Sequence, residues 1–268
     1  MRAVLSLATA ACLLLSAAPA QAEAWGRVTN SQFSYSLIDL DPEDGVTPSI
    51  SFQPVQTFPQ QAPWGRYNYW EGPVFSGEDI SGSGPGPFSM AMRAPHARVD
   101  GRASGDAADS VALELAVRAD GAAAGEDLRI HSFVVSLSQG FVLSPNTGII
   151  IESRGNFWGK VDRLGESFDG GGQLSLTSFD ADGNRSTWGR GEFLLASLEP
   201  GESGEVDRDY LVDTMYWNQS SEAVEGTLDL SVFAYAVSPV PEPAPLALAA
   251  LGAALVLLRA RRRGGRSA

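Results

Sequence analysis

The sequence predicts an all-β protein: an antiparallel β-sandwich, of the jelly-roll or immunoglobulin-like kind, between an N-terminal signal peptide and a C-terminal membrane helix. Three observations within residues 23–239 support the sandwich. Apolar and polar residues alternate with period two in segment after segment, and clusters of Gly, Pro, Asp and Asn separate these segments. No window before residue 240 shows a sustained helical period with caps.

The alternation is clearest in 110–118 and 226–237. One face of the first segment is formed by Val111, Leu113, Leu115 and Val117. One face of the second is formed by Leu228, Leu230, Val232, Ala234 and Ala236. Further strands are predicted at 33–39, 130–137, 147–152, 173–179, 191–197 and 210–217. Turns are predicted at 41–45, 120–121, 144–146, 182–183 and 199–201.

The N-terminus has the pattern of a signal peptide. Met1 and Arg2 precede an apolar run to about Ala18, and Pro19-Ala20-Gln21-Ala22 supplies the small residues of an A-x-A cleavage site. We therefore expect signal peptidase to remove 1–22 and to leave an exported body over 23–239.

The C-terminus has three parts in a fixed order: Val240-Pro241-Glu242-Pro243, an uncharged stretch over 244–258, and an arginine-rich end over 259–268. As a helix, the 15 residues of the uncharged stretch would cover about 22 Å, a short membrane span. The arginines behind it fit the positive-inside rule, so this end is expected in the cytoplasm and the body outside.

This ordered tail, 240–268, resembles the PEP-CTERM sorting domain of Gram-negative bacteria that make exopolysaccharide. The resemblance implies that an exosortase recognises Pro241, Glu242 and Pro243 and processes the chain nearby. The protein would then be an inner-membrane intermediate that is passed to the cell surface or extracellular matrix. Two prolines also favour an extended segment that a protease can bind. The alternative is a plain tail anchor with a proline-rich stalk.

Composition limits the partners of the body. Thirteen of the 19 basic and 31 of the 32 acidic residues lie within 23–239, a net charge of −18. This charge argues against nucleic acid and anionic lipid as partners, and leaves divalent cations and cationic sugars compatible. The one cysteine, Cys12, lies in the signal peptide, so the mature body has no disulfide, thiolate nucleophile or cysteine metal site.

Little in the body suggests catalysis. The two histidines, His96 and His131, lie far apart, and neither has a serine elbow or a metal-ligand pattern nearby. His131 is expected in a strand and His96 in a loop. No carboxylate pair can be assigned from the sequence, although carboxylates could serve a polysaccharide hydrolase or lyase.

Calcium is a weaker prediction. One candidate loop contains Asp180, Asp182 and Asn184, and a denser acidic cluster contains Asp39, Asp41 and Asp44, with Glu43 between the last two. Hard cations prefer clustered oxygen ligands. Tight turns explain the same residues, and the first loop departs from the EF-hand pattern, so both alternatives stay open. No other cofactor is expected.

An aromatic cluster is a candidate carbohydrate contact: Trp64, Tyr67, Tyr69 and Trp70. Aromatic faces stack on sugar rings, and neighbouring polar groups bind the hydroxyls. In a strand, however, alternation places Tyr67 and Tyr69 on one face and Trp70 on the other. At least part of the cluster is therefore expected in the core or at a sheet edge.

These observations favour an exported, non-catalytic protein with a structural, adhesive or binding role, with extracellular polysaccharide as a candidate partner. The alternatives are a secreted polysaccharide hydrolase or lyase that uses carboxylates, and a calcium-stabilised carbohydrate-binding module. The run 82–87, rich in Gly and Pro, is either a linker between two small domains or a long loop of one sandwich.

Overall fold

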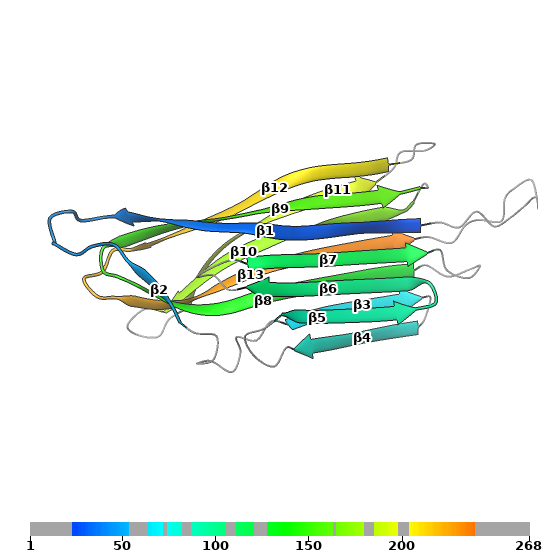
Figure 1. Ribbon diagram of the computed structural model, residues 1–268, viewed down its shortest axis with the longest axis horizontal. Helices are drawn as coiled ribbons and strands as arrows, with labels where there is room; N and C mark the ends of the chain where they lie inside the picture. The colour runs from blue at the N-terminus through cyan, green and yellow to red at the C-terminus, as the bar shows by residue number, and fades with distance from the viewer. Residues whose placement is uncertain are drawn as a thin grey trace, which may run out of the picture.

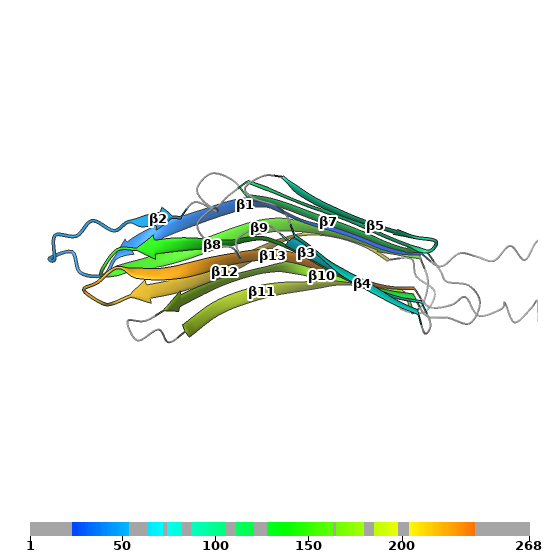
Figure 2. The same ribbon diagram turned by 90° about the horizontal axis from the view of Figure 1, so that it is seen from below.

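Two antiparallel sheets pack face to face, with their strands along the long axis of the molecule (Figure 1; Figure 2). The structure is a computed structural model, and it describes residues 23–53, 64–71, 74–81, 87–105, 111–120, 128–162, 165–179, 185–197 and 204–238. The prediction of an all-β, antiparallel, sandwich-like protein is confirmed for this part of the chain.

The first sheet has six strands in the order β12-β9-β1-β7-β6-β5. Its central strands are β9 (Thr147–Val161), β1 (Glu23–Asp39) and β7 (Val111–Asp120). The outer strands are β12 (Gly204–Asn218), β6 (Ala97–Gly105) and β5 (Phe88–Ala94). Because β1 pairs with both β7 and β9, the N-terminal strand joins the two halves of this sheet.

The second sheet has seven strands, six of them in the order β11-β10-β13-β8-β3-β4. These are β11 (Arg185–Ser197), β10 (Ser167–Phe179), β13 (Val224–Ser238), β8 (Leu128–Leu143), β3 (Trp64–Glu71) and β4 (Val74–Ser81). The short β2 (Ile50–Phe52) pairs with β8. The chain changes sheet at each step from β7 to β10 and from β11 to β13, so neither sheet forms alone.

One hydrophobic core fills the space between the sheets. Val111, Leu113, Leu115 and Val117 are at most 2% exposed, as the alternation predicts. The predicted apolar face of β13 is buried as well: Leu228, Leu230, Val232, Ala234 and Ala236. Phe157 of β9 stacks on Phe168 of β10 across the core, with ring centroids 5.3 Å apart. The core thus draws on strands from the whole described length.

Several strands are longer than predicted, and glycine explains the difference. The predicted strand 147–152 continues as β9 to Val161 through Gly155 and Gly159, which are buried on the core side. Glycine inside a strand weakens it and often marks a bulge or a close approach of another group. Here Gly155 makes room for Tyr210, because a Cβ at this position would overlap the tyrosine ring. The strands β2, β4, β5 and β6 and the first half of β1 were not predicted.

The predicted turns at 41–45 and 144–146 are present, and Asn146 takes the left-handed conformation with φ 46°. The segments 82–86, 121–127, 180–184 and 198–203 lie outside the described residues, and so do the turns predicted there. The proposed linker joins β4 of one sheet to β5 of the other.

The described residues form no helix, so they contain no helix that is long and apolar enough to cross a membrane. Residues 1–22 and 239–268 lie outside the described part, so the signal peptide and the membrane helix stay predictions. The described chain begins at Glu23 and ends at Ser238, and both residues lie at the same end of the sandwich (Figure 1).

Candidate functional site

The outer surface of the six-stranded sheet presents three tryptophans from its strands β1, β9 and β12. They are Trp25, Trp158 and Trp217, and we call the outward-facing residues of these three strands the tryptophan face. Trp25 is 37% and Trp217 39% exposed, whereas Trp158 is half-buried. The register places all three on the outer side, because the residues that alternate with them are buried in the core.

Trp217 packs against the sheet at Gly148, the residue opposite it on β9. A Cβ at this glycine would overlap two adjacent atoms of the six-membered ring, Cε3 and Cζ3, so this edge of the indole fills the space that a side chain would take. Ile38 of β1 borders the same spot. The edge of the ring is thereby held on the backbone while the residue keeps 39% of its surface open. A fixed and partly exposed indole offers apolar surface to a ligand.

Trp25 and Trp158 form a pair at the other end of the face. Their ring centroids are 4.0 Å apart, and the planes meet at 60°. The indole Nε1 of Trp158 donates a hydrogen bond of 2.9 Å to Oε1 of Glu205 on β12. This bond fixes the orientation of Trp158, and its edge contact orders Trp25 in turn. Both rings are therefore held in place before any ligand arrives.

A pocket of about 400 Å³ lies between the two tryptophan positions. It opens where a β-bulge between Asn30 and Gln32 interrupts the pairing of β1 with β9. Such a bulge leaves a residue without a partner and bends the strand away from its neighbour. The polar side chains that line the pocket are Ser31, Gln32, Arg154, Asn156 and Asp209.

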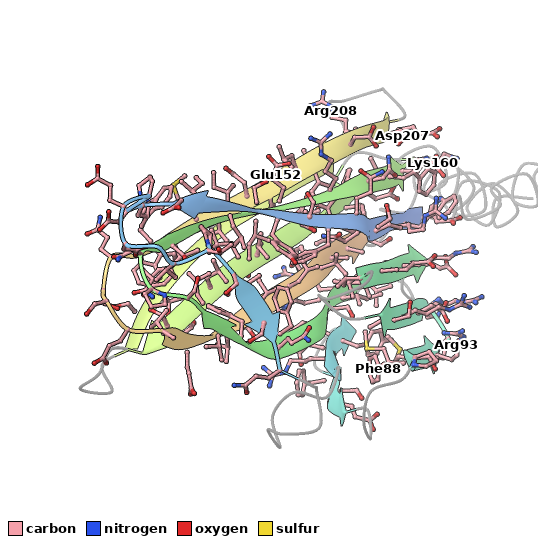
Figure 3. All side chains as sticks on the ribbon, turned by 60° about the vertical axis from the view of Figure 1, so that its left-hand side comes forward. Phe88, Arg93, Glu152, Lys160, Asp207 and Arg208 are labelled. Carbon is pink, nitrogen blue, oxygen red and sulfur yellow. The ribbon has the colours of Figure 1, made fainter. Side chains whose placement is uncertain are left out.

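The polar groups of β12 order those of β9. Nδ2 of Asn156 donates to Oδ1 of Asp207 at 2.8 Å and to Oδ1 of Asp209 at 3.2 Å. Arg154 Nη2 lies 3.7 Å from Oε2 of Glu152. Figure 3 shows Glu152, Asp207 and Lys160 along this edge of the molecule and Arg93 near the opposite edge. The pocket therefore offers donors and acceptors that suit a hydroxyl-rich ligand.

The face is long. Gly148 and Trp158 are ten residues apart on β9, which is roughly 33 Å at the rise of a β-strand. Arg154 and Asn156 lie between them on the same strand and line the pocket. Aromatic platforms thus stand at both ends of a polar depression, and their order follows the strand direction.

The predicted aromatic cluster is divided by the sheet. Tyr69 is 5% exposed and belongs to the core, while Trp70 is half-buried on the outer side and packs on Phe75 at 5.3 Å. Tyr67 pairs in register with Ser132, a buried residue, and Trp64 with Val135. The four residues therefore do not form one contact surface, as alternation along a strand requires.

The carboxylates of the acidic cluster, the second calcium candidate, close turns. Oδ1 of Asp39 accepts from the backbone N–H of Asp41, and Oδ1 of Asp41 accepts from that of Glu43. Asp44 accepts from the N–H of Val46 at 2.6 Å and from Nδ2 of Asn146 at 2.7 Å. These bonds, the Asn146 side-chain bond first, lower the pKa of Asp44.

No group of three metal-binding side chains occurs among the described residues. Asp180, Asp182 and Asn184, the first calcium candidate, lie outside them. Calcium at either place stays a prediction.

The two histidines lie where the sequence predicts them. His131 is an exposed residue of β8, and His96 lies in the turn between β5 and β6. Burial first, and then the charge of Arg66, lowers the pKa of His131. Its ring meets Tyr235 edge to face, with centroids 6.1 Å apart.

The sequence contains a signal for the tryptophan face, but this signal depends on register. The segment 154–160 alternates Arg154, Asn156, Trp158 and Lys160 with Gly155, Phe157 and Gly159. A prediction that continued the strand through its glycines would place Trp158 and Asn156 together on the outside. The partnership with Trp25 and Trp217 needs the pairing of strands more than 40 residues apart in the chain.

Comparison with known proteins adds little. No family model matches the chain, and no curated protein matches it in sequence. One solved structure is described as "Structural basis for the promiscuous specificity of the carbohydrate-binding modules from the beta-sandwich super family". It is 9% identical, and the alignment covers 78% of this chain and 96% of that chain, with a TM-score of 0.14. A likeness this low carries no argument, so the function is argued from the chain's own residues.

Proposed function

We propose that the protein is an exported, non-catalytic polysaccharide-binding protein of the cell surface or extracellular matrix. The observation that carries this proposal is the tryptophan face, where Trp217 and the Trp25–Trp158 pair flank a polar pocket on one sheet. Apolar platforms that alternate with hydrogen-bonding groups along roughly 33 Å match an extended sugar chain, whose rings have apolar faces and polar rims.

The charge of the site favours neutral or amine-bearing sugars. Glu205, Asp207 and Asp209 line the β12 side of the face. On β9, the charges of Arg154 and Lys160 are paired with Glu152 and Asp162. The body 23–239 carries a net charge of −18. A chain of uronic acids would be repelled by these carboxylates. A neutral chain meets no such penalty, and an amine-bearing chain is attracted.

The sorting part of the proposal comes from the tail. We infer that an exosortase recognises Pro241, Glu242 and Pro243 after the body has been exported, and that 244–258 holds the chain in the inner membrane until then. β1 begins and β13 ends at one end of the sandwich (Figure 1). A tail anchor would therefore place the Trp25–Trp158 pair toward the membrane and Trp217, at the other end of the tryptophan face, away from it. The Trp217 end would then be open to a ligand at the surface.

Titration of purified 23–239 with neutral, amine-bearing and uronate hexasaccharides in a calorimeter tests the binding. We expect binding of a neutral or amine-bearing hexasaccharide, loss of it in Trp217→Ala combined with Trp158→Ala, and weak binding of uronates. The proposal fails if none of the sugars binds, or if the double variant binds as well as the parent. Shortening of a long polysaccharide by the protein would instead support a hydrolase or lyase.

Mass spectrometry of the surface-released protein tests the sorting. We expect a C-terminus near Pro243, and retention in the inner membrane when Pro241, Glu242 and Pro243 are replaced by alanine. A mature protein that still ends at Ala268, or an unchanged location of the variant, would exclude the exosortase.

A further inference from the structure

The outer surface of the seven-stranded sheet carries a second set of aromatic and polar side chains, far from the tryptophan face. The strand register aligns them in a row across the sheet. Asp169 of β10 lies opposite Tyr235 of β13, and Tyr235 lies opposite His131 of β8. On β3, Trp70 comes two residues after Asn68, the partner of His131, and Phe75 of β4 faces Trp70. We call these residues the transverse row.

Two aromatic contacts order the row. The rings of Trp70 and Phe75 are tilted at 46° with centroids 5.3 Å apart, and His131 meets Tyr235 edge to face. Phe75 is 59% exposed, the largest exposure of any large hydrophobic side chain in the described part of the chain. The row therefore presents apolar surface held in fixed positions.

Asp169 is the unusual member of the row. Its Oδ1 is inaccessible to solvent and has no hydrogen-bond partner. Its neighbours across the two pairings are Tyr235 and Leu195. Burial raises the pKa of this carboxyl to about 6. A buried acceptor without a partner is costly, so Asp169 lowers the stability of the sheet at this end of the row.

We propose that the transverse row is a second polysaccharide-binding surface, so that one molecule holds two sugar chains on opposite faces of the sandwich. The row crosses five strands from β4 to β10, about 19 Å at the usual strand spacing. The tryptophan face runs along its strands instead. The two bound chains therefore cross at a large angle, and the protein acts as a node that joins them.

The polar groups in the row favour a sugar over a second copy of the protein. His131 of β8 and Asn68 of β3 lie between the rings of Tyr235 and Trp70, and Asp169 lies at the β10 end of the row. Sugar hydroxyls can accept from and donate to the amide of Asn68, while the rings stack. Two copies would bring together bodies of net charge −18 each, which opposes self-association.

The inference rests on the proposed function because both faces take the same class of ligand. Its test uses neutral hexasaccharides of β-linked and α-linked glucose for stoichiometry, and long soluble hydroxyethyl cellulose for network formation. Three proteins are compared: the parent 23–239, a transverse-row variant Trp70→Ala/Phe75→Ala, and a tryptophan-face variant Trp158→Ala/Trp217→Ala. Phe75→Ala alone serves as a milder variant, because this side chain is largely exposed.

We expect two sites per molecule in the parent and one in each double variant. The parent should raise the viscosity of hydroxyethyl cellulose, and both double variants should lose most of this effect while each still binds a hexasaccharide. Melting temperatures and circular dichroism identify a variant that fails to fold. If the transverse-row double variant does not fold, Phe75→Ala alone tests the second site. We expect this variant to bind a hexasaccharide at that site about threefold more weakly, or weaker still.

Each contrary outcome has one meaning. One site in the parent that is lost only in the tryptophan-face variant excludes the second surface and leaves the proposed function intact. No site in the parent excludes both. If light scattering shows a dimer that the transverse-row variant breaks, the row is an interface between two copies and the inference is wrong.

Discussion

At the scale of single residues, the tryptophan face depends on how one indole lies on one glycine. Trp217→Ala removes the platform over Gly148 and should weaken hexasaccharide binding roughly tenfold, since an aromatic stack is worth about 1.4 kcal/mol. Calorimetry measures the effect. Trp188→Ala is the matched control, because Trp188 is also 39% exposed but packs on Tyr216 at the open edge between β11 and β12. Equal losses in both variants would contradict the assignment.

Gly148→Ala should impair binding without removing any side chain. The added methyl would occupy the space of the Trp217 ring and must push the indole away from the sheet. We expect a weaker hexasaccharide affinity and a red shift of tryptophan fluorescence. Gly191→Ala on β11 is the control, because a Cβ there meets nothing closer than 3.6 Å. An unchanged affinity in Gly148→Ala would show that the packing of Trp217 against Gly148 is not needed for binding.

Asp169 makes a prediction about pH. Burial raises the pKa of its carboxyl from the ordinary 3.8 to about 6 in the folded protein. Between these two values the folded state holds a proton that the unfolded state has released, so the contribution to stability is greatest below pH 4 and falls as pH rises through 6. Above pH 6 the carboxyl is ionised in both states, and its buried charge destabilises the folded protein by a constant amount.

Asp169→Asn should therefore be more stable than the parent at pH 7.5, by roughly 1–2 kcal/mol, and about equal to it at pH 4. Urea denaturation at both values measures this. His131 contributes to the pH dependence with the opposite sign. Because burial, and then the charge of Arg66, lower its pKa, its contribution to the stability of the fold is lost as pH falls. Because both proteins keep His131, the difference between them isolates Asp169. A constant difference across this pH range would contradict the assignment.

At the scale of elements, alternation predicts which residues face the core but not how far a strand extends. The buried faces of β7 and β13 follow directly from the sequence, and so does the separation of Tyr69 from Trp70. The prediction for 147–152 stops before Gly155, because glycine alone does not reveal the tyrosine that will occupy its space. The tryptophan face does not follow from alternation either. Trp25, Trp158 and Trp217 come together only through the pairing of strands that are far apart in the chain.

Strand β12 contributes one testable contact through the core. Tyr210 packs against Gly172 of β10, where a Cβ would overlap its ring, and its hydroxyl donates to the carbonyl of Thr29 at 2.8 Å. Gly172→Ala should cost roughly 1–3 kcal/mol through overpacking, and Tyr210→Phe about 1 kcal/mol through the lost hydrogen bond. Urea denaturation gives both values. Because the two residues touch, the double variant should depart from additivity, and a fully additive result would contradict the contact.

At the scale of the whole molecule, the two ends of the sandwich differ in structure. The described chain enters and leaves at one end, while three loops are joined at the other. There Asn146 Nδ2 binds Asp44, its backbone N–H binds the carbonyl of Ser220, and Asn218 Nδ2 binds the carbonyl of Ser144. This arrangement fits the proposed function, in which the tail holds the protein and its long sides bind an extended polymer.

The same topology predicts that the protein cannot be divided at 82–87. Removing 23–81 would take β1 from between β7 and β9, and β3 from its place beside β8. The core face of β7 would then lose its neighbour Val28, which is 0% exposed in the whole protein. The fragment 88–239 should therefore be unfolded or aggregated, while 23–239 should unfold in one step, with tryptophan fluorescence and circular dichroism giving the same midpoint. Adding the separate chain 23–81 to 88–239 should restore part of the native spectrum. A fragment 88–239 that melts cooperatively by itself would instead support two small β domains joined by a linker.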